Sequence, residues 1–116
     1  MKTLSDLEPR ALWRYFSEMS KIPRCSKKEE AVIAWIEQVA GEHGVKALRD
    51  RGGNVLVRVP ATPGRAGTPV VALQGHVDMV CEKNAATAHD FTRDPLKLVI
   101  DGDWVYAKGT TLGADN

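Results

Sequence analysis

The sequence has few of the features that assign a chain to a specialised class of protein. Cys25 and Cys81 are its only cysteines and form no C-x-x-C pair, so we predict two free thiols rather than a disulfide framework or a zinc knuckle. No apolar run approaches the roughly 20 residues of a transmembrane helix, and the first residues lack the apolar stretch of a signal peptide. We therefore expect a cytoplasmic protein.

The chain also lacks a surplus of either charge. Its 16 basic and 15 acidic residues give a formal charge of +1, which favours neither nucleic acid nor an anionic membrane as a partner. A small peptide substrate fits this balance better. With 43% hydrophobic and 27% charged residues among 116, the composition is that of one globular unit.

Helical spacing of apolar residues predicts two helices in the first third of the chain. The first is predicted over residues ~6–20 from the spacing of Leu7, Leu12, Phe16 and Met19. Ser26 and Glu29 fit a capping box that begins the second helix, and Gly41 or Gly44 is expected to end it. The exposed end of that helix would carry His43.

Beyond residue 45 the apolar period changes toward two, which predicts strands. One β-hairpin is predicted from Val45 to Val59 around Gly52-Gly53, and a second from Leu96 to Tyr106 around Asp101-Gly102-Asp103. The apolar run Val70–Leu73 is typical of a strand buried on both faces. Residues 81–95 show no periodicity and are expected to form a long surface loop.

Helices followed by strands favour the α/β fold class. We expect a layered domain of α/β/α type, in which the N-terminal helices pack on a mixed sheet. Ligands of such sheets gather beyond the strand ends, and the predicted buried strand at 70–73 is followed directly by polar residues.

Those polar residues are the strongest candidates for a functional site. His76 and Asp78 stand two residues apart, so their side chains can project from one strand end in the same direction. One can bind a metal while the other orients the imidazole. Asp115 offers a second carboxylate in a glycine-rich turn. A hydrogen-bonded structural histidine and an ordinary turn aspartate remain open as alternatives.

Four strings of residues occur in a distinctive order. They are Gly75-His76-Val77-Asp78-Met79-Val80, His89-Asp90-Phe91 with Asp94-Pro95, Asp101-Gly102-Asp103-Trp104-Val105, and Gly109-Thr110-Thr111-Leu112-Gly113-Ala114-Asp115-Asn116. Together they resemble the co-catalytic zinc peptidase family of dipeptidases, carboxypeptidases and aminoacylases. The last string and the opening segment Ser20–Glu30 are similar to the bacterial aminoacyl-histidine dipeptidases within it. The resemblance implies that residues 1–116 are the N-terminal portion of a catalytic domain, about the first quarter of such an enzyme.

The resemblance also implies roles for three residues. His76 would be a terminal ligand of one zinc ion, Asp115 would bridge two zinc ions, and Asp78 would act as the catalytic residue that orients His76. It further implies a cis peptide between Asp115 and Asn116. A Glu-Glu pair, another acidic ligand and a late histidine would all follow Asn116. Cobalt or manganese would also suit such a carboxylate-rich site.

The activity implied is hydrolysis of dipeptides with a C-terminal histidine by a homo-oligomeric, full-length enzyme, and the isolated chain is expected to be inactive. Another amide hydrolase of the same scaffold, such as a tripeptidase, carboxypeptidase or aminoacylase, remains an alternative. So does a non-catalytic binding domain, if the chain is complete. His89 fits a loop histidine better than a residue lining a substrate cleft.

Overall fold

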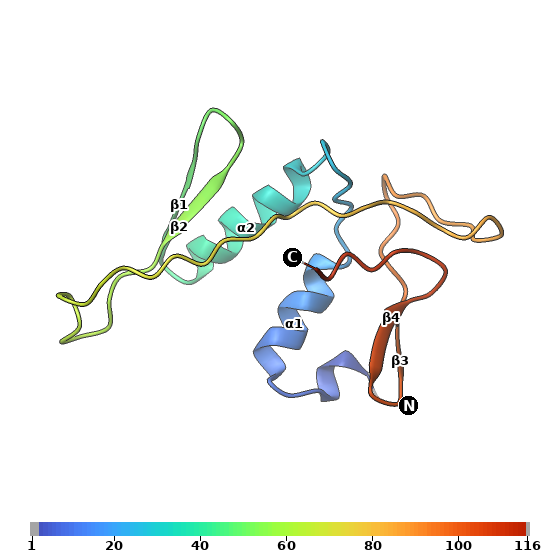
Figure 1. Ribbon diagram of the computed structural model, residues 1–116, viewed down its shortest axis with the longest axis horizontal. Coiled ribbons are helices and arrows are strands. Elements are labelled where there is room, and N and C mark those ends of the chain that lie inside the picture. The colour runs from blue at the N-terminus through green and yellow to red at the C-terminus, as the bar shows by residue number, and fades with distance from the viewer. Residues whose placement is uncertain (1–2, 116) are drawn as a thin grey trace. The chain divides into compact units, whose positions relative to one another are not determined.

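The computed structural model describes residues 3–115, which contain two α-helices and two small antiparallel sheets (Figure 1). They divide into two compact units. Unit 1 consists of the residues up to Val32 and those from Val77 onward, and unit 2 is Ile33–His76. Within the described part of the chain, no helix has the length and apolar character needed to cross a membrane.

Unit 1 begins with a 3-10 helix, Leu4–Asp6, followed by helix α1, Arg10–Met19. The predicted first helix is therefore confirmed in its main part, but it starts after Pro9 rather than at Ser5 or Asp6. Proline has no N–H to donate within a helix, and Pro9 adopts an extended conformation directly before α1. At the other end, the buried Ser20 hydroxyl donates to the Phe16 carbonyl oxygen at 2.7 Å.

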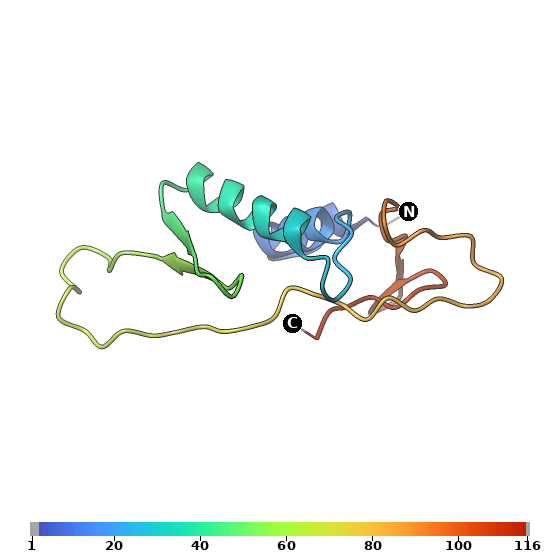
Figure 2. The same cartoon turned by 90° about the horizontal axis from the view of Figure 1, so that it is seen from above.

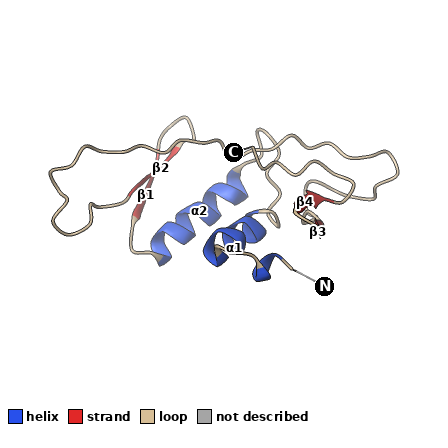
Figure 3. Cartoon of the chain, turned by 60° about the horizontal axis from the view of Figure 1, so that its bottom comes forward, coloured by secondary structure: helices blue, strands red, loops and turns tan. Residues whose placement is uncertain are grey.

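The second predicted hairpin is confirmed in unit 1. Strands β3 (Leu98–Asp101) and β4 (Trp104–Ala107) pair antiparallel, with Leu98 opposite Ala107 and Asp101 opposite Trp104. Gly102 has a φ of +57° in the connecting turn, a conformation that a side chain disfavours. Figure 3 shows that the residues between the two hairpins are loop throughout.

Helix α2 (Glu30–Glu42) leads into unit 2 and begins later than the capping box over Ser26–Glu29 requires. It ends just before Gly44, whose φ is +67°, and His43 is exposed there as expected. Strands β1 (Lys46–Arg49) and β2 (Val55–Arg58) then form the first predicted hairpin (Figure 2). An ion pair of 2.8 Å between Arg49 and Glu37 ties β1 to α2.

The prediction of a buried strand at Val70–Leu73 is wrong for this structure. The run has no regular structure, and Val70, Val71 and Leu73 are 96%, 82% and 96% exposed. A strand buried on both faces requires neighbours on its two edges, and no described residue pairs with this run in a ladder. The apolar composition of the run favoured the prediction of burial, but composition does not supply the neighbouring strands that burial requires.

The α/β class is confirmed, since helices and strands are both present. The strands of the described residues form two separate two-stranded antiparallel sheets, rather than the one mixed sheet that we expected. Six of the seven buried described residues lie in unit 1, namely Ser20, Arg24, Val32, Met79, His89 and Ala107. The packed interior that positions the candidate site therefore belongs to unit 1.

Candidate functional site

Three segments of unit 1 run side by side and carry the candidate site. Cys25 and Met79 form a parallel bridge, and the Met79 N–H donates to the Arg24 carbonyl oxygen at 3.0 Å. Lys83 and Thr110 form an antiparallel bridge in the same unit. Backbone pairing holds together residues 24–25, 79–84 and 109–111, although they are far apart in sequence. With the residues that the Arg24 side chain binds, the three site segments are 24–25, 77–84 and 109–113.

The hydroxyl of Thr111 adds side-chain bonds between two of these segments. It donates to the Val80 carbonyl oxygen at 2.5 Å and accepts from the Glu82 N–H at 3.2 Å. The Thr111 N–H in turn donates to the Glu82 carbonyl oxygen at 2.9 Å. The second threonine of the glycine-rich string therefore fixes the backbone that follows Asp78.

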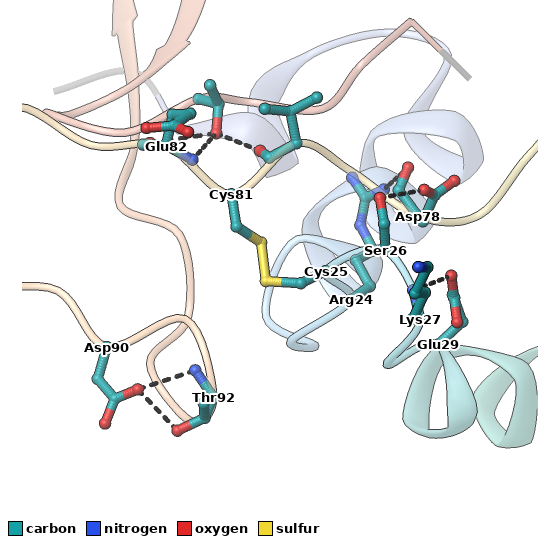
Figure 4. The surroundings of a disulfide bond; sticks show 12 residues. Arg24, Cys25, Ser26, Lys27, Glu29, Asp78, Cys81, Glu82, Asp90 and Thr92 are labelled. Atoms are coloured by element: carbon teal, nitrogen blue, oxygen red, sulfur yellow. Dashed lines mark hydrogen bonds between the residues drawn. A yellow bond between two sulfur atoms is a disulfide. The ribbon is translucent and has the colours of Figure 1, made fainter.

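Cys25 and Cys81 form a disulfide, so the prediction of two free thiols is wrong (Figure 4). The two cysteines are 56 residues apart in sequence, and their Cα atoms lie 5.6 Å apart. That separation falls within the range a disulfide spans. Sequence spacing could not reveal the pair, because the backbone pairing of Cys25 with Met79 is what brings Cys81 close.

Arg24 is the most deeply buried charged residue of the site, with 1% of its surface exposed. Its Nη1 donates to the carbonyl oxygens of Val77 and Asp78 at 3.1 and 3.5 Å, and its Nη2 donates to the Gly113 carbonyl oxygen at 2.6 Å. One guanidinium therefore joins the segment that contains Asp78 to the segment that leads to Asp115.

The environment of Arg24 acts on its pKa in two opposed ways. Burial lowers the pKa of the guanidinium below its ordinary value, whereas the nearby Asp115 and Asp78 raise it. Desolvation disfavours a charged group, and neighbouring negative charges favour it. Both candidate acidic residues thus interact with the same buried cation.

Gly113 lies where backbone and side chains approach most closely. Its φ is +64°, and a Cβ added there would lie 2.5 Å from the Met79 Cβ and 3.1 Å from the Arg24 Nη2. A side chain at this position would therefore clash as well as strain the backbone. The glycine of the Leu-Gly-Ala-Asp string has a physical reason to be there.

Asp78 receives a second polar contact that the sequence did not predict. The Ser26 hydroxyl donates to its Oδ2 at 2.5 Å (Figure 4). Charge-assisted hydrogen bonds of this kind restrict the orientation of a carboxylate. Ser26, assigned from the sequence to the start of α2, thus supports a candidate site residue instead.

The three predicted site residues fall in different units. Asp78 and Asp115 belong to unit 1, where Asp78 is half-buried and Asp115 exposed, and His76 is the exposed last residue of unit 2. The convergence of His76 with the two aspartates, and the orienting role of Asp78, therefore stay predictions. The predicted cis peptide involves Asn116, which lies outside the described residues.

The donor types agree with a zinc site, because imidazole and carboxylate are common zinc ligands. Their number is smaller than a complete site needs. Among residues 3–115, no group of three or more His, Cys, Asp or Glu side chains is arranged to hold a metal ion. Catalytic zinc sites usually take three protein ligands per ion. These residues can thus supply only part of such a centre.

Two other features of unit 1 do not join the candidate site. His89 is buried and packs edge-on against Phe91 at 4.5 Å between ring centroids, which agrees with its interpretation as a loop histidine. A hollow of about 600 Å³ lies between residues 23–31 and 91–93, beside Cys25. None of the three predicted site residues lines it, so we do not assign the substrate there.

Sequence reasoning missed Arg24 and Ser26 as supports of the site. Both stand in the opening string that carries the family resemblance, which was the only available signal. No periodicity distinguishes a buried arginine from a solvated one, and each contact joins residues more than 50 positions apart.

The chain is similar over its whole length to known dipeptidases. It is 49% identical to the cytosol non-specific dipeptidase of Escherichia coli K12, across all of this chain and 24% of that protein. The crystal structure of an aminoacylhistidine dipeptidase from Vibrio alginolyticus matches 99% of the chain and 24% of that protein, with 50% identity and a TM-score of 0.95. No protein-family model matches the chain.

These matches confirm the resemblance read from the motifs. The chain spans about a quarter of the length of the relatives it matches.

Proposed function

We propose that this chain contributes part of the active site of a zinc-dependent dipeptidase that hydrolyses dipeptides with a C-terminal histidine. The observation that carries the proposal is that Arg24 joins the segment of Asp78 to the segment Gly113–Asp115. It is made in a chain that is 49% and 50% identical in sequence to two dipeptidases. The name of the Escherichia coli relative supports the cytoplasm as its location, and we propose a homo-oligomeric enzyme.

His76 and Asp115 would hold the metal. His76 would donate a ring nitrogen to one zinc ion, and Asp115 would use its carboxylate oxygens as the bridge between two. Two bound zinc ions would lower the pKa of a shared water and polarise the scissile carbonyl. Cobalt or manganese would serve as replacements.

The remaining residues of the chain act on these ligands. Asp78 would accept a hydrogen bond from the second ring nitrogen of His76 and so fix the tautomer of the imidazole. Ser26 restricts the orientation of the Asp78 carboxylate, because the Ser26 hydroxyl donates a hydrogen bond to Asp78 Oδ2. Thr111 and Gly113 keep the segment that follows Asp78 and the segment before Asp115 close together within unit 1.

A second candidate activity is hydrolysis of dipeptides without a requirement for histidine. The name of the Escherichia coli relative, a non-specific dipeptidase, favours it. A panel of dipeptides matched in their first residue and varied in the second separates the two. A strong preference in kcat/KM for C-terminal histidine supports the first candidate, and comparable values support the second.

The decisive experiment uses a full-length protein that contains this chain. After removal of metal with a chelator and return of zinc, we expect hydrolysis of an Xaa-His dipeptide into two free amino acids. His76→Ala and Asp115→Ala should each reduce kcat by more than about a hundredfold, because each removes a ligand. Release of an acyl group, or of amino acids from tripeptides alone, would instead indicate another amide hydrolase.

We further propose that the 116-residue chain alone is inactive. Its described residues lack the set of ligands that a catalytic zinc ion needs. Zinc-dependent dipeptide hydrolysis by the purified chain, at a rate comparable with that of the full-length protein, would refute this statement while leaving the peptidase assignment intact.

A further inference from the structure

We infer that Arg24 is a positioning residue of the metal site. It holds the backbone beside Asp78 and Asp115, so that the Asp78 carboxylate faces His76 and the Asp115 carboxylate faces the metal ions. This inference rests on the proposed function and adds a residue to it. Arg24 itself binds neither metal nor substrate, and it acts through the two segments it joins.

The first contact of Arg24 is with the segment that contains Asp78. Its Nη1 donates to the carbonyl oxygens of Val77 and Asp78, while its own carbonyl oxygen accepts from the Met79 N–H at 3.0 Å. Backbone and side chain of one residue thus hold three consecutive residues around Asp78. Rotation of that backbone, which would turn the Asp78 side chain, requires these bonds to break.

The second contact of Arg24 is with the segment before Asp115. The Nη2 bond to the Gly113 carbonyl oxygen, at 2.6 Å, is the shortest that Arg24 makes. Because Gly113 also packs against Met79, with no room for a Cβ, this segment is fixed from two sides. Asp115 follows only two residues later and interacts electrostatically with the guanidinium.

The shape of the guanidinium explains why arginine suits this position. Its planar fork presents several N–H donors in fixed directions, and here two of its nitrogens serve two separate segments. A lysine ammonium keeps the charge but is a single point on a flexible stem. Replacement by lysine therefore separates the positioning effect from the effect of charge.

Charge and positioning predict opposite changes in metal affinity. By charge alone, loss of a cation close to the Asp115 ligand and to Asp78 should tighten the binding of a divalent cation. By positioning, loss of the fork should let the two segments move and weaken binding. Residues that orient metal ligands typically change metal affinity by about tenfold to a hundredfold when replaced.

The test compares Arg24→Lys and Arg24→Gln in the full-length protein. Zinc affinity is measured by competition with a coloured chelator, and the absorption spectrum of the cobalt-loaded protein reports ligand geometry. We expect both variants to bind zinc at least about tenfold more weakly and to show an altered cobalt spectrum. Arg14→Lys and Arg14→Gln, at an exposed position of α1, should leave both readouts unchanged.

Val32→Ala serves as a second control, because it removes buried volume from unit 1 at a residue that belongs to none of the three site segments. If it lowers zinc affinity as much as Arg24→Gln at an equal loss of melting temperature, Arg24 is merely structural and the inference is wrong. Unchanged or tighter zinc binding by Arg24→Gln also overturns it. Should that variant fail to fold, Arg24→Lys decides alone, and wild-type affinity in it overturns the inference.

Failure of the proposed function looks different. It would appear as a wild-type protein that neither binds zinc nor hydrolyses dipeptides. Failure of the Arg24 inference would appear as an active, zinc-binding wild type whose Arg24 variants match it in affinity and spectrum.

Discussion

Unit 1 and unit 2 are held together in different ways. Unit 1 has a disulfide, a buried arginine that joins two segments, and most of the buried residues. Unit 2 has a hairpin joined to a helix by an ion pair and contains only one buried described residue, Ala40. Its apolar run Val70–Leu73 is exposed.

The difference shows which contacts a stretch of chain can supply for itself. Hairpins and helices need only neighbours in sequence, so they form in both units. The candidate site needs segments that are 29 to 89 residues apart in sequence. In unit 1, Arg24, Cys25 and Thr111 join such segments. Long-range polar contacts, rather than a large apolar core, therefore organise the site.

Loss of the disulfide is expected to have the largest effect on stability, and to affect unit 1 more than unit 2. Closing a loop of 56 residues restricts the unfolded chain, and the chain-entropy relation gives about 4 kcal/mol of stabilisation. Cys25→Ser with Cys81→Ser should lower the free energy of unfolding by that order, measured by denaturant titration. Amide exchange should quicken more in β3–β4 than in β1–β2.

A dithiol reductant gives the matched comparison. It should destabilise the wild-type chain as the double serine replacement does, and it should leave the serine variant unaffected. Equal stability of the oxidised and reduced wild type would contradict the assigned role of the disulfide.

Gly113→Ala should have the next largest effect, a loss of about 2 kcal/mol or more in the stability of unit 1. The new Cβ would meet Met79 at 2.5 Å in a backbone conformation with φ of +64°. Gly53→Ala in unit 2 is the matched control, since its φ is +87° and nothing lies within 4 Å of the added Cβ. It should cost about 1 kcal/mol, the conformational cost alone. Equal losses in thermal unfolding would show that the close packing at Gly113 contributes nothing.

Truncation of a valine to alanine should have the third largest effect, and its cost in stability should differ between the two units. Val32→Ala removes fully buried apolar volume and should cost about 2 kcal/mol. Val71→Ala, at a position 82% exposed, should change stability by less than about 0.5 kcal/mol. A larger cost at Val71, read from urea unfolding, would mean that the exposed run is packed in solution.

The smallest effect concerns the pKa of Asp90 in unit 1. Hydrogen bonds from the Thr92 hydroxyl and the Thr92 N–H lower it, and the carboxylate form is thereby favoured in the folded state (Figure 4). This contribution to stability is present above the unfolded pKa and is lost as the pH falls through the folded pKa.

Thr92→Val removes one of these donors, so the Asp90 pKa should rise toward its ordinary value in carboxyl NMR titrations. Thr68→Val in unit 2 is the control, because that hydroxyl donates to a backbone carbonyl oxygen instead of a carboxylate. An unchanged Asp90 pKa in Thr92→Val would show that the hydroxyl bond does not form.

The sequence predicts those features that depend on interactions between residues close together along the chain. Both hairpins and both helices were predictable, because apolar periodicity and turn glycines such as Gly44 and Gly102 act over a few residues. The late start of α1 was also readable in principle, since Pro9 is a local signal. The exposure of Val70–Leu73 was not, because burial depends on partners that no local pattern reveals.

The candidate site was predictable only in part. The motifs placed Asp78 and Asp115 in segments that unit 1 brings to one guanidinium, and that guanidinium was itself invisible to pattern analysis. The disulfide contradicts the prediction of two free thiols, which was made from the sequence spacing of the cysteines. Cysteine spacing indicates a motif only when both cysteines lie in one local turn, and here the fold pairs residues 56 positions apart.

The crosslink between Cys25 and Cys81 has a topological consequence. Every residue of unit 2 lies between the two cysteines along the chain, so the whole of that unit is enclosed within one covalent ring. A protease that cuts the exposed proline-containing stretch at 60–69 would open the ring without releasing a piece. The nicked protein would migrate as a single species on a denaturing gel until a thiol is added, and would then separate into two.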